Sequence, residues 1–424
     1  MNLKSTPASA DPLMTLTRGL AHLKAPLTPE AHPAAYGVGR LFQVGPHTAA
    51  ILLNLRAGGV NVIDFEMGAD LVLFDTVASI DLTRAIPLKR NAPFRHPRGG
   101  AAQVWVKYAG NVGFVPFGES LPGGRAHPHA GTGFSIGRNL GFPADLSVRR
   151  FADVPDPVSQ LELQQYRYDG QRFELLETSR LDPRELLPEW DGWGGAMSTA
   201  LADGEDLLMP FSAIRRSGGS AAPKTPVVTR WRRRNGAWLP IEAHPVMDAV
   251  NCMEPSMVRD RDGALLLCAR HGWPPHTADT PCLRVWRSTD GVDWQRIIDV
   301  PGVRSSGPLA LHQTPWGQPV VLGNGPNAGR FMRSSISIWP LNAARDGITQ
   351  DTVVFDADER FGPAPAYAWN ADHPLGASVR LRDGQRHALV AIRVCENTEV
   401  VRDALPTPAT GCYLETIIPQ PTKG

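Results

Sequence analysis

The feature that most constrains the fold is a β-hairpin signature that recurs along the chain. Each copy has alternating apolar residues, an aromatic residue and an Arg, then a turn ending in Gly, then further apolar residues. Asp-Gly and Asn-Gly accept the positive φ that tight hairpin turns require. The copies are LQQYRYDGQRFELL, VTRWRRRNGAWLPI, LRVWRSTDGVDWQRII and the looser ISIWPLNAARDGITQDTVVF, with turn glycines Gly170, Gly236, Gly291 and Gly347. Recurrence at intervals of 55 to 66 residues predicts a repeat architecture.

A second hairpin series alternates with the first. Its members carry two apolar strands around Gly204, Gly263, Gly317 and Gly384. Two hairpins per unit of roughly 55 residues make a four-stranded blade, and a ring of such blades is a β-propeller. Residues 39–55 and 100–118 are expected to be earlier inner hairpins, and GCYLETIIP to help close the ring. Two β-sandwiches are the alternative, which the alternation of hairpin types disfavours.

These patterns predict an all-β fold with antiparallel, four-stranded blades. We expect a seven-bladed β-propeller, with six blades as the alternative. Residues 1–30 are expected to form an N-terminal extension, and residues 31–424 a single propeller domain. A total of 41 Gly and 39 Pro among 424 residues suits a chain rich in turns.

Charge and cysteine usage limit the classes of partner. The net charge is +1, so neither nucleic acid nor a membrane surface is an expected partner, and the basic run RWRRRNG is expected to form a solvated strand face. Five Cys residues include no C-x-x-C pair and are interpreted as free thiols. No apolar segment of secretory type opens the chain, which predicts a cytoplasmic protein, or an exported one if a leader has been removed.

The turn from Ser288 to Trp294 carries a family resemblance. Its pattern S-x-D-G-x-x-W, with Asp290 and Gly291, resembles a shortened Asp-box hairpin of sialidase-like propellers, and EPSMV (254–258) is similar to inner strands of that superfamily. Within it, the chain looks most similar to propeller enzymes that cleave uronate-containing glycans, namely ulvan lyases and rhamnosyl-glucuronate-cleaving enzymes. The resemblance implies a seven-bladed ring with an active site at one face.

Blade geometry predicts which residues meet at that face. Turns within hairpins lie at one end of the ring, so the starts of first strands and the ends of second strands lie at the other. Functional residues concentrate on such converging loops. The expected substrate-binding residues are Arg95, Trp190, Trp193, Arg215, Asn251, Asn324, Arg330, Trp369, His373 and Arg393. Arg binds carboxylates, Trp stacks on sugar rings and Asn bridges hydroxyls, so this mixture indicates an acidic oligo- or polysaccharide as the ligand.

Two reaction types suit such a ligand. In a uronate lyase, an Arg or a divalent metal neutralises the carboxylate and a His or Tyr removes the neighbouring proton. The motifs imply no particular cofactor or metal ligand. His129 is the first candidate for the base and His127 the second, because proline fixes the backbone between them. The other expected catalytic residues are Tyr367, His271, Arg270 and Glu254.

The alternatives are a glycoside hydrolase and a non-catalytic carbohydrate-binding propeller. An exo-acting hydrolase of rhamnosidase or sialidase type needs two carboxyl groups, for which Asp191, Glu254, Asp372 and Glu396 are available. The abundance of His and Arg over acids favours elimination. Propellers host many unrelated functions, so the fold leaves the binding-only alternative open.

Overall fold

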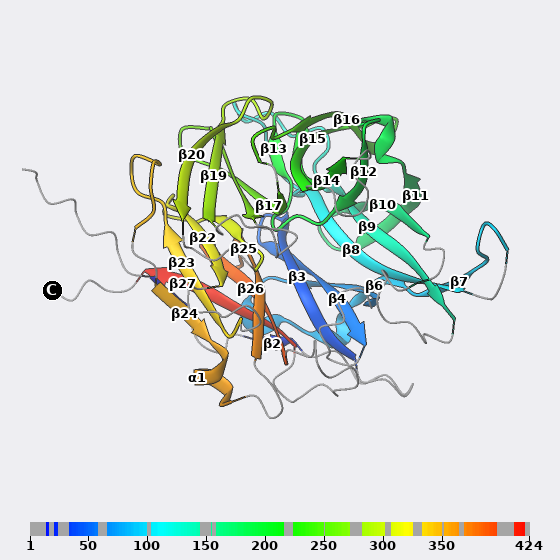
Figure 1. Cartoon of the computed structure of the whole chain (residues 1–424), viewed down its shortest axis with the longest axis horizontal. Coiled ribbons are helices and arrows are strands. Elements are labelled where there is room, and N and C mark those ends of the chain that lie inside the picture. The colour runs from blue at the N-terminus through cyan, green and yellow to red at the C-terminus, as the bar shows by residue number, and fades with distance from the viewer. Residues whose placement is uncertain are drawn as a thin grey trace, which may run out of the picture.

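The computed structural model of the chain is a ring of six β-sheets around a central axis (Figure 1). Each sheet is an antiparallel blade of four or five strands. The structure describes residues 14–16, 21–23, 34–57, 66–99, 103–144, 154, 158–215, 224–249, 251–271, 282–301, 307–324, 333–349, 352–363, 369–396 and 411–419.

The first two blades lie between residues 34 and 181. Blade 1 comprises β3 (Ala34–Gly45), β4 (Thr48–Ala57), β5 (Glu66–Phe74) and β6 (Ile86–Arg90). Short 3-10 turns, η1 (Val77–Ser79) and η2 (Leu82–Arg84), separate its last two strands. Blade 2 comprises β7 (Ala92–Phe94), β8 (Gln103–Val115), β9 (Thr132–Pro143), β10 (Ser159–Tyr168) and β11 (Phe173–Leu181).

The next two blades follow the paired-hairpin pattern of the sequence. After the 3-10 turn η4 (Pro183–Glu185), blade 3 comprises β12 (Trp190–Gly194), β13 (Leu201–Asp203), β14 (Asp206–Arg215), β15 (Lys224–Arg234) and β16 (Ala237–Pro245). Blade 4 comprises β17 (Cys252–Arg259), β18 (Leu265–His271), β19 (Cys282–Ser288) and β20 (Gln295–Pro301).

The last blade is completed by strands from both ends of the chain. Blade 5 comprises β21 (Ala310–Gln313), β22 (Pro319–Asn324), β23 (Ser335–Pro340) and β24 (Thr352–Asp356), followed by helix α1 (Ala357–Phe361). Blade 6 comprises β25 (Trp369–Arg380), β26 (Arg386–Glu396) and β27 (Gly411–Pro419). Its outer edge pairs with β1 (Met14–Leu16) and β2 (Ala21–Leu23), from the segment expected to be an extension.

The hydrophobic core consists of six clusters, and each lies between two neighbouring blades. Neighbouring residues of one strand reach opposite clusters: Leu265 packs toward blade 3 and Leu266 toward blade 5. The cluster containing Tyr36 and Leu414 joins blade 6 to blade 1. Six blades with six interfaces make a closed ring, so the expectation of seven blades is wrong and the six-bladed alternative holds.

Residues 100–118 also differ from the sequence prediction. They were expected to be a hairpin, but residues 103–115 form the single strand β8. Gly110 is no turn residue: a Cβ there would lie 2.1 Å from the carbonyl oxygen of Ile136, so glycine permits close contact with β9. The register shift between Ala109 and Asn111 marks a bulge at this point.

The recurrent hairpins form as predicted. The outer hairpins are β10–β11, β15–β16, β19–β20 and β23–β24, and Gly170, Gly236 and Gly291 adopt positive φ. In the turn from Ser288 to Trp294, Asp290 Oδ1 accepts hydrogen bonds from the amides of Val292 and Asp293 at 2.8 and 3.0 Å. Trp286 is fully buried, and its Nε1 donates to Asp248 at 2.6 Å. These residues are scaffold.

Candidate functional site

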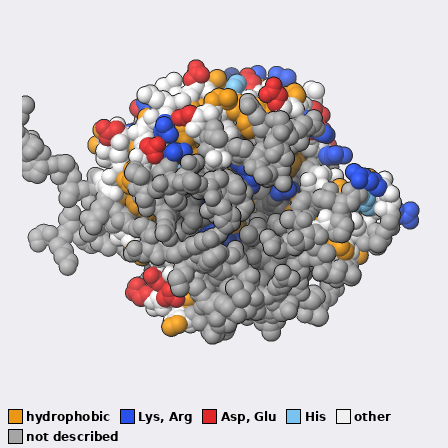
Figure 2. Space-filling model, in the orientation of Figure 1, with side chains coloured by type: hydrophobic (Ala, Val, Ile, Leu, Met, Phe, Trp, Pro, Cys, Tyr) orange, Lys and Arg blue, Asp and Glu red, His pale blue; other side chains and the backbone are white. Residues whose placement is uncertain are grey.

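The ring has two unlike ends. At one, the turn face, lie the hairpin turns β13–β14, β17–β18, β21–β22 and β25–β26. At the other, the open face, the first strands of the blades begin and the second strands end. Figure 2 shows Lys and Arg side chains in a hollow near the centre of the side turned to the viewer.

Two β-bulges shape the open face. Register shifts interrupt β17 between Met253 and Ser256, and β25 between Asp372 and Leu375. At these bulges Glu254 and His373 have φ values of 53° and 51°, which non-glycine residues seldom adopt. Each precedes a proline, and each lies at the same position of its blade. Bulges re-aim side chains, and here they aim Glu254 and His373 at the same cluster of charges.

Asp372 and Arg393 form the base of this cluster. The Arg393 guanidinium donates to both carboxylate oxygens of Asp372, at 2.7 and 2.5 Å, and both side chains are buried. Arg333 adds a third contact from blade 5, with Nη1 3.0 Å from Asp372 Oδ2. Burial raises the pKa of Asp372, but the charges of Arg393, His373 and Arg333 outweigh burial and hold it well below its usual range. Asp372 is therefore an anion at neutral pH.

Arg270 and Glu254 form a second ion pair in the same cluster. Arg270 Nη1, from the end of β18, donates to Glu254 Oε2 at 3.1 Å. Burial raises the pKa of Glu254, while the nearby charges of Arg270, His373 and Arg333 lower it further, so the net shift is downward. Among the side chains that the structure describes, the cluster contains three guanidinium groups and two carboxylates, which amount to one positive unit before His373 is considered.

His373 contacts the base of the cluster with one ring nitrogen. Its Nδ1 lies 2.8 Å from Asp372 Oδ1. Burial lowers the pKa of His373, Asp372 raises it and Arg393 lowers it, with a net downward shift that keeps the ring neutral at pH 7. Its other nitrogen, Nε2, and Oε1 of Glu254 have no hydrogen-bond partner in the part of the chain that the structure describes, and neither atom is fully buried. Neither atom is committed to a contact with the residues that the structure describes.

The structure thus brings Arg270, Glu254, His373 and Arg393 together. In addition, Arg333 belongs to the cluster and was not predicted. Its signal is topological: third strands begin at the same end of the ring where second strands finish, and Arg333 directly precedes β23. The repeated X-Pro step at Glu254-Pro255 and His373-Pro374 is a second signal visible in the sequence.

His127 and His129 lie at the other end of the ring, so their expected position is wrong. They belong to the turn between β8 and β9, and His127 Nε2 lies 3.2 Å from the Gly204 carbonyl oxygen in the β13–β14 turn. The His129 ring contacts His127 and Trp238, with centroid distances of 5.7 and 5.5 Å. Burial, followed by the charges of Arg233 and His127, lowers the pKa of His129.

Two of the three tryptophans that were expected to stack on sugar are core residues. Trp190 is buried between blades 2 and 3. Trp369 is 2% exposed, and its Nε1 donates to the Gly362 carbonyl at 2.6 Å. Blades pack on both faces, so the first residues of an inner strand turn toward the neighbouring blade as readily as toward the axis.

The side chains of the remaining predicted residues are not part of the charged cluster in the described structure, although Asn324 Nδ2 donates to the Ala371 carbonyl beside it at 2.8 Å. Asn324 and His271 are buried, Asn251 is half-buried with φ of 61°, and Arg95 is exposed beyond β7. Trp193 and Arg215 lie in β12 and at the end of β14. Tyr367 and Arg330 lie outside the described residues.

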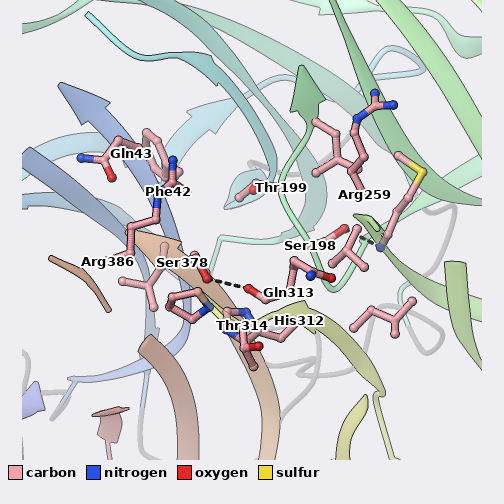
Figure 3. Close-up of a pocket in the computed structure, with 18 of the residues that line it drawn as sticks. Phe42, Gln43, Ser198, Thr199, Arg259, His312, Gln313, Thr314, Ser378 and Arg386 are labelled. Carbon is pink, nitrogen blue, oxygen red and sulfur yellow. Dashed lines mark hydrogen bonds between the residues drawn. The ribbon is translucent and has the colours of Figure 1, made fainter. Parts of the chain in front are cut away.

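A cavity of about 550 Å³ opens at the turn face (Figure 3). Residues of all six blades line it, and Ser378 Oγ donates to the Gln313 carbonyl at 2.6 Å. His312 also lines it, but its unpartnered Nε2 is fully buried and out of reach of a ligand.

Metal and membrane features are limited in the described part of the chain. No group of three or more His, Cys, Asp or Glu side chains there is arranged to hold a metal ion. The helices in the described ranges include none long and apolar enough to cross a bilayer.

Comparison with known proteins places the fold. No protein-family model matches the chain, and no curated protein is similar to it in sequence. Among solved structures, it is similar to a Trypanosoma rangeli sialidase, with a TM-score of 0.52 and 12% identity, over 90% of this chain and 54% of that one. The chain therefore spans about half the length of that sialidase.

Two further solved structures are matched over a larger share of their own length. A leech intramolecular trans-sialidase has a TM-score of 0.55 and 11% identity, over 89% of this chain and 68% of that one. A Dyadobacter fermentans protein of unknown function has a TM-score of 0.52 and 13% identity, over 91% of this chain and 95% of that one. The chain thus has the sialidase-like β-propeller fold. Similarity to ulvan lyases, expected from the sequence, is not among these findings.

Proposed function

We propose that the protein is a carbohydrate-active enzyme that binds an acidic sugar at the open face and cleaves its glycan by β-elimination. The observation that carries this proposal is the excess of guanidinium groups over carboxylates, beside a neutral histidine held by Asp372. Such a site attracts a carboxylate and offers a base next to it.

Arg270 and Arg333 are the groups that would hold the carboxylate. Their side chains are 12% and 20% exposed, whereas Arg393 is 4% exposed beneath them. Arginine presents a planar fork of donors that matches a carboxylate. Neutralising a uronate carboxylate makes the proton on the neighbouring C5 removable, which is the first requirement of elimination.

His373 would be the base. Nδ1 lies 2.8 Å from Asp372 Oδ1 at the base of the cluster, and Nε2 has no partner in the described structure. Nε2 takes the C5 proton, the C5–H electron pair becomes the C4–C5 double bond, and the C4–O bond to the leaving sugar breaks. A second group then protonates the leaving oxygen, and Tyr367 and His271 are the expected catalytic residues that could supply this proton. A positioned histidine contributes about 10² to 10⁴-fold to such a step.

Hydrolysis is the second candidate, because the similar folds with named activities are sialidases and a trans-sialidase. A glycosidase of the two-carboxyl type needs one protonated acid. Arginines hold both Glu254 and Asp372 below their ordinary pKa, so neither carboxyl supplies a proton at neutral pH. This electrostatic pattern favours elimination.

The test offers purified protein a panel of uronate glycans, including ulvan and gum arabic, and follows the ultraviolet absorbance of the 4,5-unsaturated product. Absorbance lost in His373→Ala, but kept in His387→Ala on β26, supports the proposal. Because protonation silences the base, activity should persist below the ordinary His pKa of about 6.5 and fall at more acidic pH. Sugar release without absorbance would instead establish hydrolysis. Carbohydrate binding without any product would establish the binding-only alternative.

A further inference from the structure

Two blades carry the same backbone device at the open face. Glu254-Pro255 in β17 and His373-Pro374 in β25 each lie at a bulge where the residue before proline adopts a positive φ. In blade 5, between them, Gly307-Pro308 precedes β21, and a Cβ on Gly307 would lie 2.1 Å from Asn324 Oδ1. A larger residue than glycine would therefore displace the Asn324 side chain.

The backbone at Glu254 is strained. A left-handed conformation in a residue other than glycine costs on the order of 1–3 kcal/mol and persists where the surroundings enforce it. Ser212 Oγ of blade 3 accepts a hydrogen bond from the Glu254 amide at 2.7 Å and so secures the bulge. An ion pair with Arg270 alone does not require this conformation, since glutamate reaches arginine across ordinary strand pairs. The strain points to a task for the carboxylate itself.

One carboxylate oxygen of Glu254 accepts a hydrogen bond, and the other has no partner among the described residues. Oε2 accepts from Arg270, while Oε1 has no partner within the described ranges and is not fully buried. An ionised carboxylate oxygen is only an acceptor, so a group that meets Oε1 must be a donor. In an acidic sugar held by Arg270 through its carboxylate, the donors nearest to that carboxylate are ring hydroxyls.

We propose that Glu254 is a specificity-determining residue that accepts a hydrogen bond from a ring hydroxyl of the bound acidic sugar. The inference rests on the proposed function, because it requires the carboxylate to lie on Arg270 and Arg333. The site then selects hydroxylated ring acids, such as uronates, over carboxylates without hydroxyls. Glu254 then binds a hydroxyl and Arg270 binds the carboxylate of the same sugar ring, so the two side chains together recognise two neighbouring groups.

The experiment compares two probes by calorimetric titration: D-glucuronate, and tetrahydropyran-2-carboxylate, which has the same ring and carboxylate without hydroxyls. The variant is Glu254→Gln, and the matched control is Glu242→Gln, which neutralises an Arg-paired glutamate on β16. Hydrogen bonds to charged groups are strong, so Glu254→Gln should weaken glucuronate binding about tenfold or more. Affinity for tetrahydropyran-2-carboxylate should stay unchanged, which also shows that the variant is folded. Glu242→Gln should change neither.

Three results would overturn the inference. If wild type binds both probes equally, hydroxyl recognition fails while carboxylate binding stands. If Glu254→Gln weakens both probes equally, Glu254 acts only by orienting Arg270. If wild type binds neither probe, the carboxylate site of the proposed function fails together with the inference.

Discussion

The burial of His312 leads to a quantitative prediction for the pH dependence of stability. His312 lies on β21 against Gly376 of the neighbouring blade, and burial lowers its pKa from 6.5 to about 4, with a smaller opposing contribution from a backbone hydrogen bond at Gly376. No charged side chain contributes to the shift, so the pKa reports burial directly. His312→Asn, which keeps a short donor toward Gly376, is the perturbation.

The sign follows from proton binding. Below about pH 6.5 the unfolded chain binds a proton at His312, whereas the folded chain does not bind it until about pH 4. Acid therefore favours unfolding. The contribution is negligible near pH 7.5, reaches a loss of about 2 kcal/mol near pH 5, and approaches about 3 kcal/mol near pH 4. Stability therefore falls as the pH falls through this window.

The assay is urea unfolding of wild type and His312→Asn at about pH 7.5 and about pH 5. The variant will be less stable than wild type at the higher pH, because it leaves a small void, but it should lose about 2 kcal/mol less on acidification. His387→Asn, a histidine near the turn face of blade 6 beside Asp383, serves as the control. Equal acid sensitivity in wild type and His312→Asn would refute the reasoning.

Further predictions concern packing and charge. Asp372→Asn removes the carboxylate that accepts two hydrogen bonds from the buried Arg393 and should cost about 3–5 kcal/mol in urea unfolding. Gly376→Ala would place a Cβ 2.7 Å from His312 Nδ1, so we expect a loss of about 1–3 kcal/mol in the same assay. Trp286→Phe removes the hydrogen bond from Nε1 to Asp248 and should lower the unfolding free energy by about 1–3 kcal/mol. The near-ultraviolet circular dichroism spectrum should still show a folded propeller.

The sequence was most informative about the repeating hairpins. Gly204, Gly263 and Gly384 mark true turns because each takes a positive φ. Gly110 resembled them in sequence but serves a close approach between β8 and β9. Because Gly110 was taken as a turn residue, β8 was predicted to be two strands. The strands of blade 2 were then assigned in the wrong order, and His129 was expected at the wrong end of the ring. Local sequence cannot distinguish a glycine needed for φ from a glycine needed for space.

The candidate site was predicted in part. Arg270, Glu254, His373 and Arg393 were expected at the open face from strand order alone, and the structure gathers them there. Their pairing was not predictable, since it depends on how far neighbouring blades rotate about the axis. Arg333 was missed because only first and second strands were considered. Trp369 was misplaced because alternation does not tell which of two buried faces a residue takes.

The closure of blade 6 has a consequence for biosynthesis. Met14 pairs with Pro419, so the first and last strands of the ring are hydrogen-bonded neighbours. The blade cannot be completed until β27 has left the ribosome, so the emerging β1 and β2 remain without their partner strand until then. Contacts so distant in sequence form slowly. Nascent chains should therefore expose an unpaired blade edge throughout translation, a vulnerable interval in which general chaperones would be expected to engage them.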